Sequence, residues 1–147
     1  MELILWRHAD AENGVPDEDR KLTAKGEKQA ERMAAWLKEN LPKDVVVLAS
    51  PARRARDTAE ALTKKFDTIR EVGTSANAQA VLKAAGWPRG ERTVVVVGHQ
   101  PTLGQAAALA LTGKTADWSI KKGAIWWLIA RGPNEVLVQA VIAPDIL

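Results

Sequence analysis

The chain has 147 residues, a formal net charge of +3, two histidines and no cysteine. This length fits one compact domain over residues 1–147, and the lack of cysteine excludes a disulfide framework, a thiolate nucleophile and a cysteine zinc site. The sequence shows neither the ~20-residue apolar run of a membrane helix nor a signal peptide, so we expect a cytoplasmic protein without a membrane partner.

The basic pI of about 9.3 raises nucleic-acid binding as an alternative function. Lysine and arginine are interleaved with aspartate and glutamate along the chain, however, and form no basic stripe with aromatic support. We therefore predict a solvated surface with a local anion site and no nucleic-acid partner.

In the first half of the chain, short apolar runs alternate with helical patterns. We expect a strand at residues 3–6, a polar loop at 7–21, and a helix from the Thr23 N-cap to Asn40. A second strand at 45–49 precedes a helix opened by Ser50-Pro51. The buried faces of the two helices are predicted to be Ala30, Met33, Ala34 and Leu37, and then Ala55, Ala59, Leu62 and Phe66.

The second half continues this alternation. We expect a weaker strand at residues 67–72, a helix capped by Ser75 and ended by Gly86, and a clear strand at 93–97. Pro101 begins an alanine-rich helix that stops near Gly113, and residues 124–130 and 135–142 form a hairpin around 131–134. Within it, Trp126 and Trp127 are predicted to face opposite sides, one inward and one outward.

This alternation predicts a single-domain, three-layer α/β/α sandwich with a mostly parallel central sheet. In such sheets, ligands bind beyond the carboxyl ends of the strands. Arg7-His8 and Gly98-His99 each follow a predicted strand, and Ser50-Pro51 leads into Arg53, Arg54 and Arg56. We therefore expect both histidines of the chain to meet at one edge, with arginines beside them.

Imidazoles next to guanidinium groups suit a phosphoryl group. Arginine binds phosphate oxygens bidentately, and histidine is a competent nucleophile. Each residue also has a structural alternative. Either histidine taken alone fits an ordinary strand end, Ser50 fits a helix N-cap, and Arg53 and Arg56 compete with Arg54 for the same role.

Four segments resemble the histidine phosphatase superfamily, also called the phosphoglycerate mutase-like group, in its own order. They are Arg7-His8-Ala9, the run from Arg20-Lys21-Leu22-Thr23 to Gln29-Ala30, Ser50-Pro51-Ala52-Arg53-Arg54-Ala55, and Val97-Gly98-His99-Gln100-Pro101. The short chain and its Pro144-Asp145-Ile146-Leu147 ending resemble the short phosphohistidine phosphatases of the SixA type. Ala9 departs from the glycine of the commoner signature.

The resemblance implies a role for each matching residue. His8 is the nucleophile that becomes transiently phosphorylated, while Arg7 and Arg54 hold the phosphoryl oxygens. His99 donates to an equatorial oxygen, and Arg20 is a further candidate phosphate contact. No metal and no other cofactor is implied.

The family's general acid is missing from the expected region. Residues 72–77 contain no carboxylate, and Glu71 is the nearest acid. Asp10, Glu12, Asp17 and Asp19 lie in the first loop and are further candidates that could approach the site. Phosphohistidine has a better leaving group than a phosphate ester and needs less acid catalysis, so we predict hydrolysis of phosphohistidine on a protein.

Two alternative functions are kept beside this one. The first is a small-molecule phosphomonoesterase acting on a sugar phosphate or nucleotide. The second is a non-catalytic phosphate- or phosphoprotein-binding module on the same scaffold. The sequence specifies no oligomeric state and is compatible with a monomer.

Overall fold

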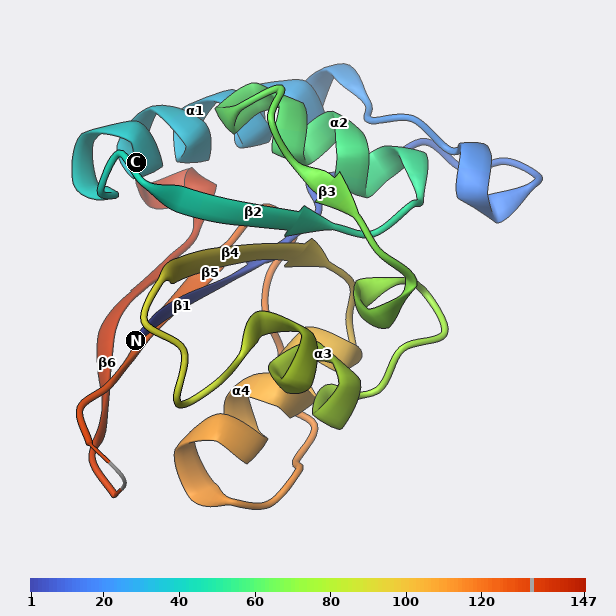
Figure 1. Ribbon diagram of the computed structural model, residues 1–147. Helices are drawn as coiled ribbons and strands as arrows, with labels where there is room; N and C mark the ends of the chain where they lie inside the picture. The colour runs from blue at the N-terminus through green and yellow to red at the C-terminus, as the bar shows by residue number, and fades with distance from the viewer. Residues whose placement is uncertain (133) are drawn as a thin grey trace.

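In the computed structural model, which describes residues 1–132 and 134–147, a six-stranded sheet is ordered β3-β2-β4-β1-β5-β6 (Figure 1). The strands are β1 (Glu2–Arg7), β2 (Val45–Ala49), β3 (Asp67–Thr68), β4 (Thr93–Gly98), β5 (Ile125–Ala130) and β6 (Val136–Ile142). β1, β2, β3 and β4 pair in parallel, whereas β5 pairs antiparallel with both β1 and β6. The sheet is therefore mixed, with an antiparallel hairpin added beside its central strand β1.

Helices cover both faces of the sheet. They are α1 (Ala24–Asn40), α2 (Arg53–Leu62), α3 (Ala78–Ala85) and α4 (Thr102–Thr112), with short 3-10 turns η1 (Asp17–Asp19), η2 (Arg70–Val72) and η3 (Pro144–Ile146). Figure 1 shows α1 and α2 above the sheet and α3 and α4 below it. This confirms the predicted three-layer α/β/α class. None of the helices in the described part of the chain has the length and apolar character to cross a membrane.

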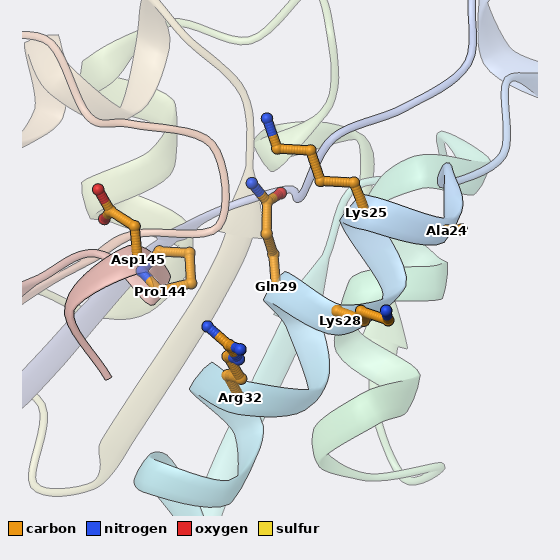
Figure 2. Close-up of a pocket in the computed structure, with 7 residues that line it drawn as sticks. All are labelled: Ala24, Lys25, Lys28, Gln29, Arg32, Pro144 and Asp145. Atoms are coloured by element: carbon orange, nitrogen blue, oxygen red, sulfur yellow. The ribbon is translucent and has the colours of Figure 1, made fainter.

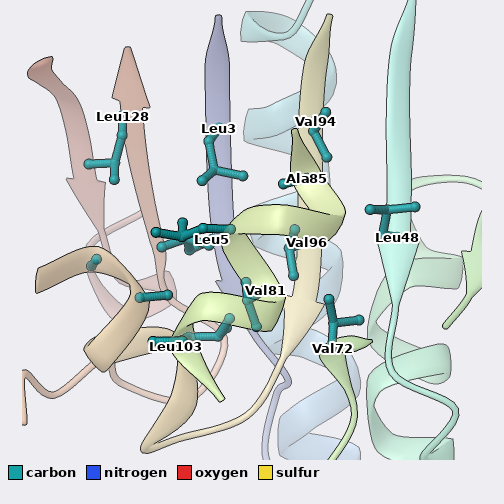
Figure 3. Close-up of a cluster of buried hydrophobic side chains, with 14 of the residues drawn as sticks. Leu3, Leu5, Leu48, Val72, Val81, Ala85, Val94, Val96, Leu103 and Leu128 are labelled. Carbon is teal, nitrogen blue, oxygen red and sulfur yellow. The ribbon is translucent and has the colours of Figure 1, made fainter. Parts of the chain in front are cut away.

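The core is divided between the two faces because side chains alternate along each strand. Leu3 and Leu5 of β1 belong to the cluster under α3 and α4, which Figure 3 shows together with Val81 and Leu103. Ile4 and Trp6 face the opposite side, where they join the cluster beneath α1 and α2. A central strand that is buried on both faces explains the continuous apolar run that predicted it.

Helix α1 follows its prediction closely. Thr23 is the N-cap, and its side chain accepts a hydrogen bond from the Gly26 N–H. The predicted inner face of Ala30, Met33, Ala34 and Leu37 is buried. The Gly26 backbone packs so tightly against that of Asp10 that a Cβ would overlap the Asp10 carbonyl. α1 is thereby fixed against the loop that follows β1.

Several predicted element ends are wrong. α2 begins at Arg53 after an Ala52 N-cap and ends at Leu62, so Phe66 lies beyond it. The N-cap of α3 is Asn77, which accepts from Ala80 N at 2.8 Å, and not Ser75. Propensity alone places helix starts within a few residues, and the cap hydrogen bond decides between neighbours.

The weak third strand is also shorter than predicted. β3 spans only Asp67–Thr68 at the sheet edge, and the chain then turns through η2. Val72, predicted as the end of the strand, is instead buried against the cluster under α3 and α4. Packing of this one apolar side chain takes the segment out of the sheet.

The hairpin forms as predicted from β5 and β6, while Pro133 of its predicted turn lies outside the described residues. Neither tryptophan of β5 faces outward, contrary to the prediction. Trp127 is buried in the cluster beneath α1 and α2, and Trp126 is partly buried on the other face, stacked on Trp118 at a ring distance of 5.5 Å. Helices cover both faces of the sheet here, so the alternating side chains of β5 enter two different buried clusters, one on each face.

Candidate active site

The two histidines of the chain meet at the carboxyl ends of adjacent parallel strands. Arg7 of β1 is in register with Gly98 of β4, and His8 N donates to Gly98 O at 3.0 Å. The imidazole centroids of His8 and His99 are consequently 5.2 Å apart. Both rings are buried but line one cavity of about 390 Å³, together with Arg7, Arg20 and Arg54. All five residues predicted for the site are therefore brought together.

His8 is held in one tautomer by its neighbour. Its Nδ1 lies 2.7 Å from the carbonyl oxygen of Ala9, which can only accept, so Nδ1 carries the proton. Nε2 is then unprotonated and has a free lone pair. Burial lowers the pKa of His8 to about 4, and the positive charges of Arg54 and Arg7 add to this effect. The ring is therefore neutral at pH 7, as a nitrogen nucleophile must be.

Ala9 occupies the position of the family glycine without backbone strain. The side chain is fully buried against Leu22 and Ala30. Among the described residues, only glycines have a positive φ, so Ala9 adopts an ordinary backbone conformation. Its N–H donates to Thr58 Oγ1 at 3.0 Å, which ties the segment after β1 to α2.

His99 is oriented by a buried serine. Its Nε2 is 2.8 Å from Ser50 Oγ, and the same oxygen accepts from Ala52 N at 3.1 Å. Ser50 thus accepts a hydrogen bond just before α2, whose N-cap is Ala52 and not Ser50, and also contacts the second histidine. Burial lowers the pKa of His99 to about 3, with smaller contributions from His8 and Arg54.

Arg7 brings a half-buried guanidinium group to the cavity, and Arg54 a buried one. Arg7 Nη1 donates to Ile120 O at 2.9 Å. Arg54 donates from Nη1 to Asp17 O at 2.9 Å and from Nη2 to Asp17 Oδ2 at 3.1 Å. In both side chains Nε is buried without a hydrogen-bond partner among the described residues. Such orphaned charged donors are costly, and an anion in the cavity is the natural acceptor.

The three arginines of α2 differ in position. Arg54 has a side chain only 5% exposed, whereas that of Arg53 is 49% exposed and pairs with Asp57. Arg56 is also exposed, and it donates to Pro51 O at 3.0 Å. The structure thus assigns to the cavity the arginine that the family resemblance selects.

Arg20 reaches the cavity from the first loop and is tied to the same carboxylate as Arg54. Its Nε is 3.0 Å from Asp17 Oδ1. Burial raises the pKa of Asp17, but the hydrogen bonds from Arg20 and Arg54 outweigh this effect and leave the pKa below its ordinary value. Asp17 is consequently an ionised partner for two arginines and a poor proton donor.

The other candidate acids lie elsewhere. Asp17 is the sole carboxylate among the described residues that line the cavity, and Glu71 is exposed within η2. Asp10 is at the rim, where hydrogen bonds from Lys122 and Thr23 lower its pKa. Asp17 and Asp10 are thus both held in their charged form, while Glu18 lies outside the cavity lining and accepts a hydrogen bond from the lining residue Thr74 at 3.1 Å.

Sequence reasoning missed Lys122, Gln100 and Thr74, which line the same cavity. Lys122 Nζ is 2.9 Å from Asp10 Oδ1, in the irregular segment before β5. Gln100 donates to Trp118 O and accepts from Gly104 N, so it fixes the turn after His99. No motif marks Lys122, and the pairing of β5 beside β1 is the feature that brings it to the site.

Comparison with known proteins places the chain in a family. Residues 3–77 match the histidine phosphatase superfamily (branch 1). A curated protein of Picosynechococcus sp. is 33% identical over 138 residues, which cover 85% of this chain and 82% of the relative. The chain therefore belongs to the histidine phosphatase superfamily.

Solved structures establish the same fold. The protein histidine phosphatase SixA complexed with tungstate superposes with a TM-score of 0.86, at 24% identity and 99% coverage of both chains. Phosphoserine phosphatase of Entamoeba histolytica, solved with 3-phosphoglyceric acid, gives a TM-score of 0.72 at 18% identity, covering 97% of this chain and 96% of the other. Both likenesses confirm the phosphoglycerate mutase-like fold predicted from the sequence.

Proposed function

We propose that the protein hydrolyses phosphohistidine on a protein substrate through a covalent phosphohistidine on His8. The observation that carries the substrate class is that Asp17, the one carboxylate among the described residues that line the cavity, and Asp10 at its rim are held ionised by cations. An ester leaves as a basic alkoxide and needs a proton donor, whereas an imidazole protonated on its other nitrogen leaves as a neutral ring.

The first step is attack of His8 Nε2 on phosphorus. The Nδ1 hydrogen bond to Ala9 O directs the lone pair of Nε2 toward the cavity and stabilises the ring as it gains charge. The N–P bond to Nε2 forms while the bond to the substrate imidazole breaks, and the electron pair of that bond stays on the departing ring.

The remaining residues stabilise the transferring group. The guanidinium groups of Arg7 and Arg54, which line the cavity, are donors for its oxygens. His99 is held through Nε2 by Ser50, so Nδ1 is the ring nitrogen left for an equatorial oxygen. Arg20 and Lys122 add positive charge at the cavity wall. Water then attacks phospho-His8, which releases inorganic phosphate and regenerates neutral Nε2.

The relative solved with an oxyanion supports this assignment. Tungstate has the tetrahedral shape and charge of phosphate, and SixA binds it on a fold that this chain shares over its whole length. The alternative of a small-molecule phosphomonoesterase predicts a proton donor near the leaving group, and the ionised state of Asp17 argues against that role.

A substrate panel tests the proposal. We expect a phosphohistidine peptide to be hydrolysed with a kcat/KM at least about 100-fold above those of sugar phosphates, nucleotides and an aryl phosphate, which is the usual worth of a missing proton donor. Acid-quenched enzyme should carry acid-labile, alkali-stable phosphate during turnover. Equal rates across the panel would show a general phosphomonoesterase, and no turnover with any substrate would favour a binding module.

A further inference from the structure

A second cavity, of about 430 Å³, lies between the first half of α1 and the turn η3. Lys25, Gln29 and Arg32 on the helix and Pro144 and Asp145 in η3 form its walls, as Figure 2 shows, together with Lys28. We call this cavity the α1 groove. It shares no lining residue with the cavity that contains the histidines.

The fold places the α1 groove beside the active site. β6 runs in the same direction as β1, because β5 is antiparallel to both, so η3 follows β6 at the edge where His8 follows β1. Gly123 joins the two places. Its N–H is 3.1 Å from both Arg7 O and His8 O.

The Cα of Gly123 faces the α1 groove. A Cβ at this residue would lie 3.1 Å from Pro144 Cγ and 3.3 Å from Gln29 Cβ, so glycine allows both groove walls to approach. Gln29 also accepts from Asp10 N at 2.9 Å, and Asp10 is the partner of Lys122 at the active-site rim. A ligand in one cavity is therefore next to a ligand in the other.

The α1 groove has three cations against one carboxylate, that of Asp145, which pairs with Lys121. Lys25, Lys28 and Arg32 are exposed, and none of them forms an ion pair with any residue in 1–132 or 134–147. The glutamates of the same helix, Glu27 and Glu31, line a different cavity with Arg53 and Asp57. The charges of α1 are thus segregated, with its cations toward η3.

This positive charge continues into the active site. Lys25 is close enough to Asp10 for its charge to contribute to the lowered pKa of that carboxyl, and Lys122 acts on the same group from the other side. A substrate that places a phosphoryl group at His8 therefore meets further cations in the α1 groove. An anionic group adjacent to the phosphorylated residue is the complementary ligand.

We propose that the α1 groove binds an acidic segment of the phosphorylated protein, next to the phosphohistidine that enters the active site. This inference rests on the proposed function. The side-chain stems of Lys25 and Arg32 and the ring of Pro144 supply apolar contact, and the charged ends of the two cations pair with carboxylates. The groove thereby distinguishes partner proteins that the small catalytic pocket alone cannot distinguish.

Two phosphohistidine peptides test this docking site, one flanked by glutamates and the other by glutamines. We expect the wild-type kcat/KM for the glutamate peptide to exceed that for the glutamine peptide about tenfold at low salt. The double variant Lys25→Glu/Arg32→Glu should abolish this preference. The control Lys38→Glu/Lys43→Glu makes the same charge change at the far end of α1 and in the turn that follows it, and should preserve the preference.

Two further measurements separate this inference from the proposed function. Hydrolysis of an aryl phosphate should be unchanged in both double variants, since neither alters the catalytic cavity. Binding of an unphosphorylated, fluorescent glutamate peptide, measured by anisotropy, should weaken about tenfold in the groove variant alone. This second measurement needs no turnover, so it tests the groove even if phosphohistidine proves not to be the substrate.

Three results would overturn the docking site. They are equal kcat/KM values for the two peptides on the wild-type protein, a preference that survives Lys25→Glu/Arg32→Glu, and equal losses in the groove and control variants. Tighter binding of a mixed-sequence oligonucleotide than of the glutamate peptide would also contradict it, because the groove would then be a general polyanion surface.

Discussion

The parallel half of the sheet and its antiparallel edge contribute different things to the active site. The strands β1 and β4 lead into His8 and His99, which are proposed to act in the reaction, and β2 leads into Ser50, which contacts His99. The segment that enters β5 contributes mainly backbone, namely the carbonyl of Ile120 that accepts from Arg7 and the N–H of Gly123. The reactive groups thus come from one half, and the other half holds them in place.

The largest effect is expected when the proposed nucleophile, which belongs to the parallel half, is removed. We expect His8→Ala to lower kcat at least about 10⁴-fold, because the covalent route needs Nε2. The hydrogen bond from His8 N to Gly98 O belongs to the backbone, so the fold should be retained in circular dichroism. Turnover at the wild-type rate would remove His8 from the mechanism.

The next largest effect should follow loss of the hydroxyl that orients His99. Ser50→Ala leaves Nε2 of a buried imidazole without its partner, and we expect kcat to fall between about 10-fold and 100-fold with little change in KM. Thr93→Ala is the control, since Thr93 is another buried hydroxyl at the opposite end of β4. If both variants lose activity equally, Ser50 is only a helix cap.

A smaller effect is expected from the antiparallel edge. Lys122→Met removes one positive charge from the cavity wall and leaves Asp10 without its cation. We expect KM and the inhibition constant of inorganic phosphate to rise about tenfold, with kcat nearly unchanged. Lys121→Met is the matched control, because that side chain is 75% exposed and pairs with Asp145. Identical KM values and inhibition constants for the two variants would show that the antiparallel edge contributes only backbone contacts to the site.

The last prediction concerns the stability of the fold and its pH dependence, and not a rate. Burial lowers the pKa values of His8 and His99 from 6.5 to about 4 and about 3, so between these values the unfolded chain binds more protons than the folded chain. The free energy of unfolding should therefore decrease as the pH falls from about 6.5 to about 4.5, by up to about 1.4 kcal/mol per pH unit for each histidine.

Denaturant unfolding at several pH values measures this slope. The double variant His8→Asn/His99→Asn should lack the histidine contribution, most clearly above about pH 5.5, where carboxylates of ordinary pKa remain almost fully ionised. If the wild-type protein and the double variant showed the same slope, the two imidazoles would take up protons equally in the folded and unfolded states, contrary to their buried environment.

The parallel half of the sheet was largely predictable from the sequence. Apolar runs defined β1, β2 and β4, and the residues after them identified Arg7, His8 and His99 as neighbours. The reason is that strand order follows from crossover connections, so residues at strand ends converge whatever the details of the loops.

The rest of the site depends on contacts that have no local signal. Whether Arg20 and Arg54 share Asp17, or Lys122 meets Asp10, depends on how loops distant in sequence pack together. The outward tryptophan was mispredicted for a similar reason. Alternation indicates two faces, but it does not say that helices cover both.

Gly123 limits which substitutions this protein can tolerate at the junction of its two cavities. Its N–H contacts the carbonyls of Arg7 and His8, its φ is +75°, and its Cα faces Pro144 and Gln29. A mutation there would disturb the active site and the α1 groove together, so it would persist only with compensating changes at Gln29 or Pro144. In the proposed docking site, Lys25, Lys28 and Arg32 are exposed and take no part in this junction, so substitutions at these three residues would alter the charge of the groove while the junction stays fixed.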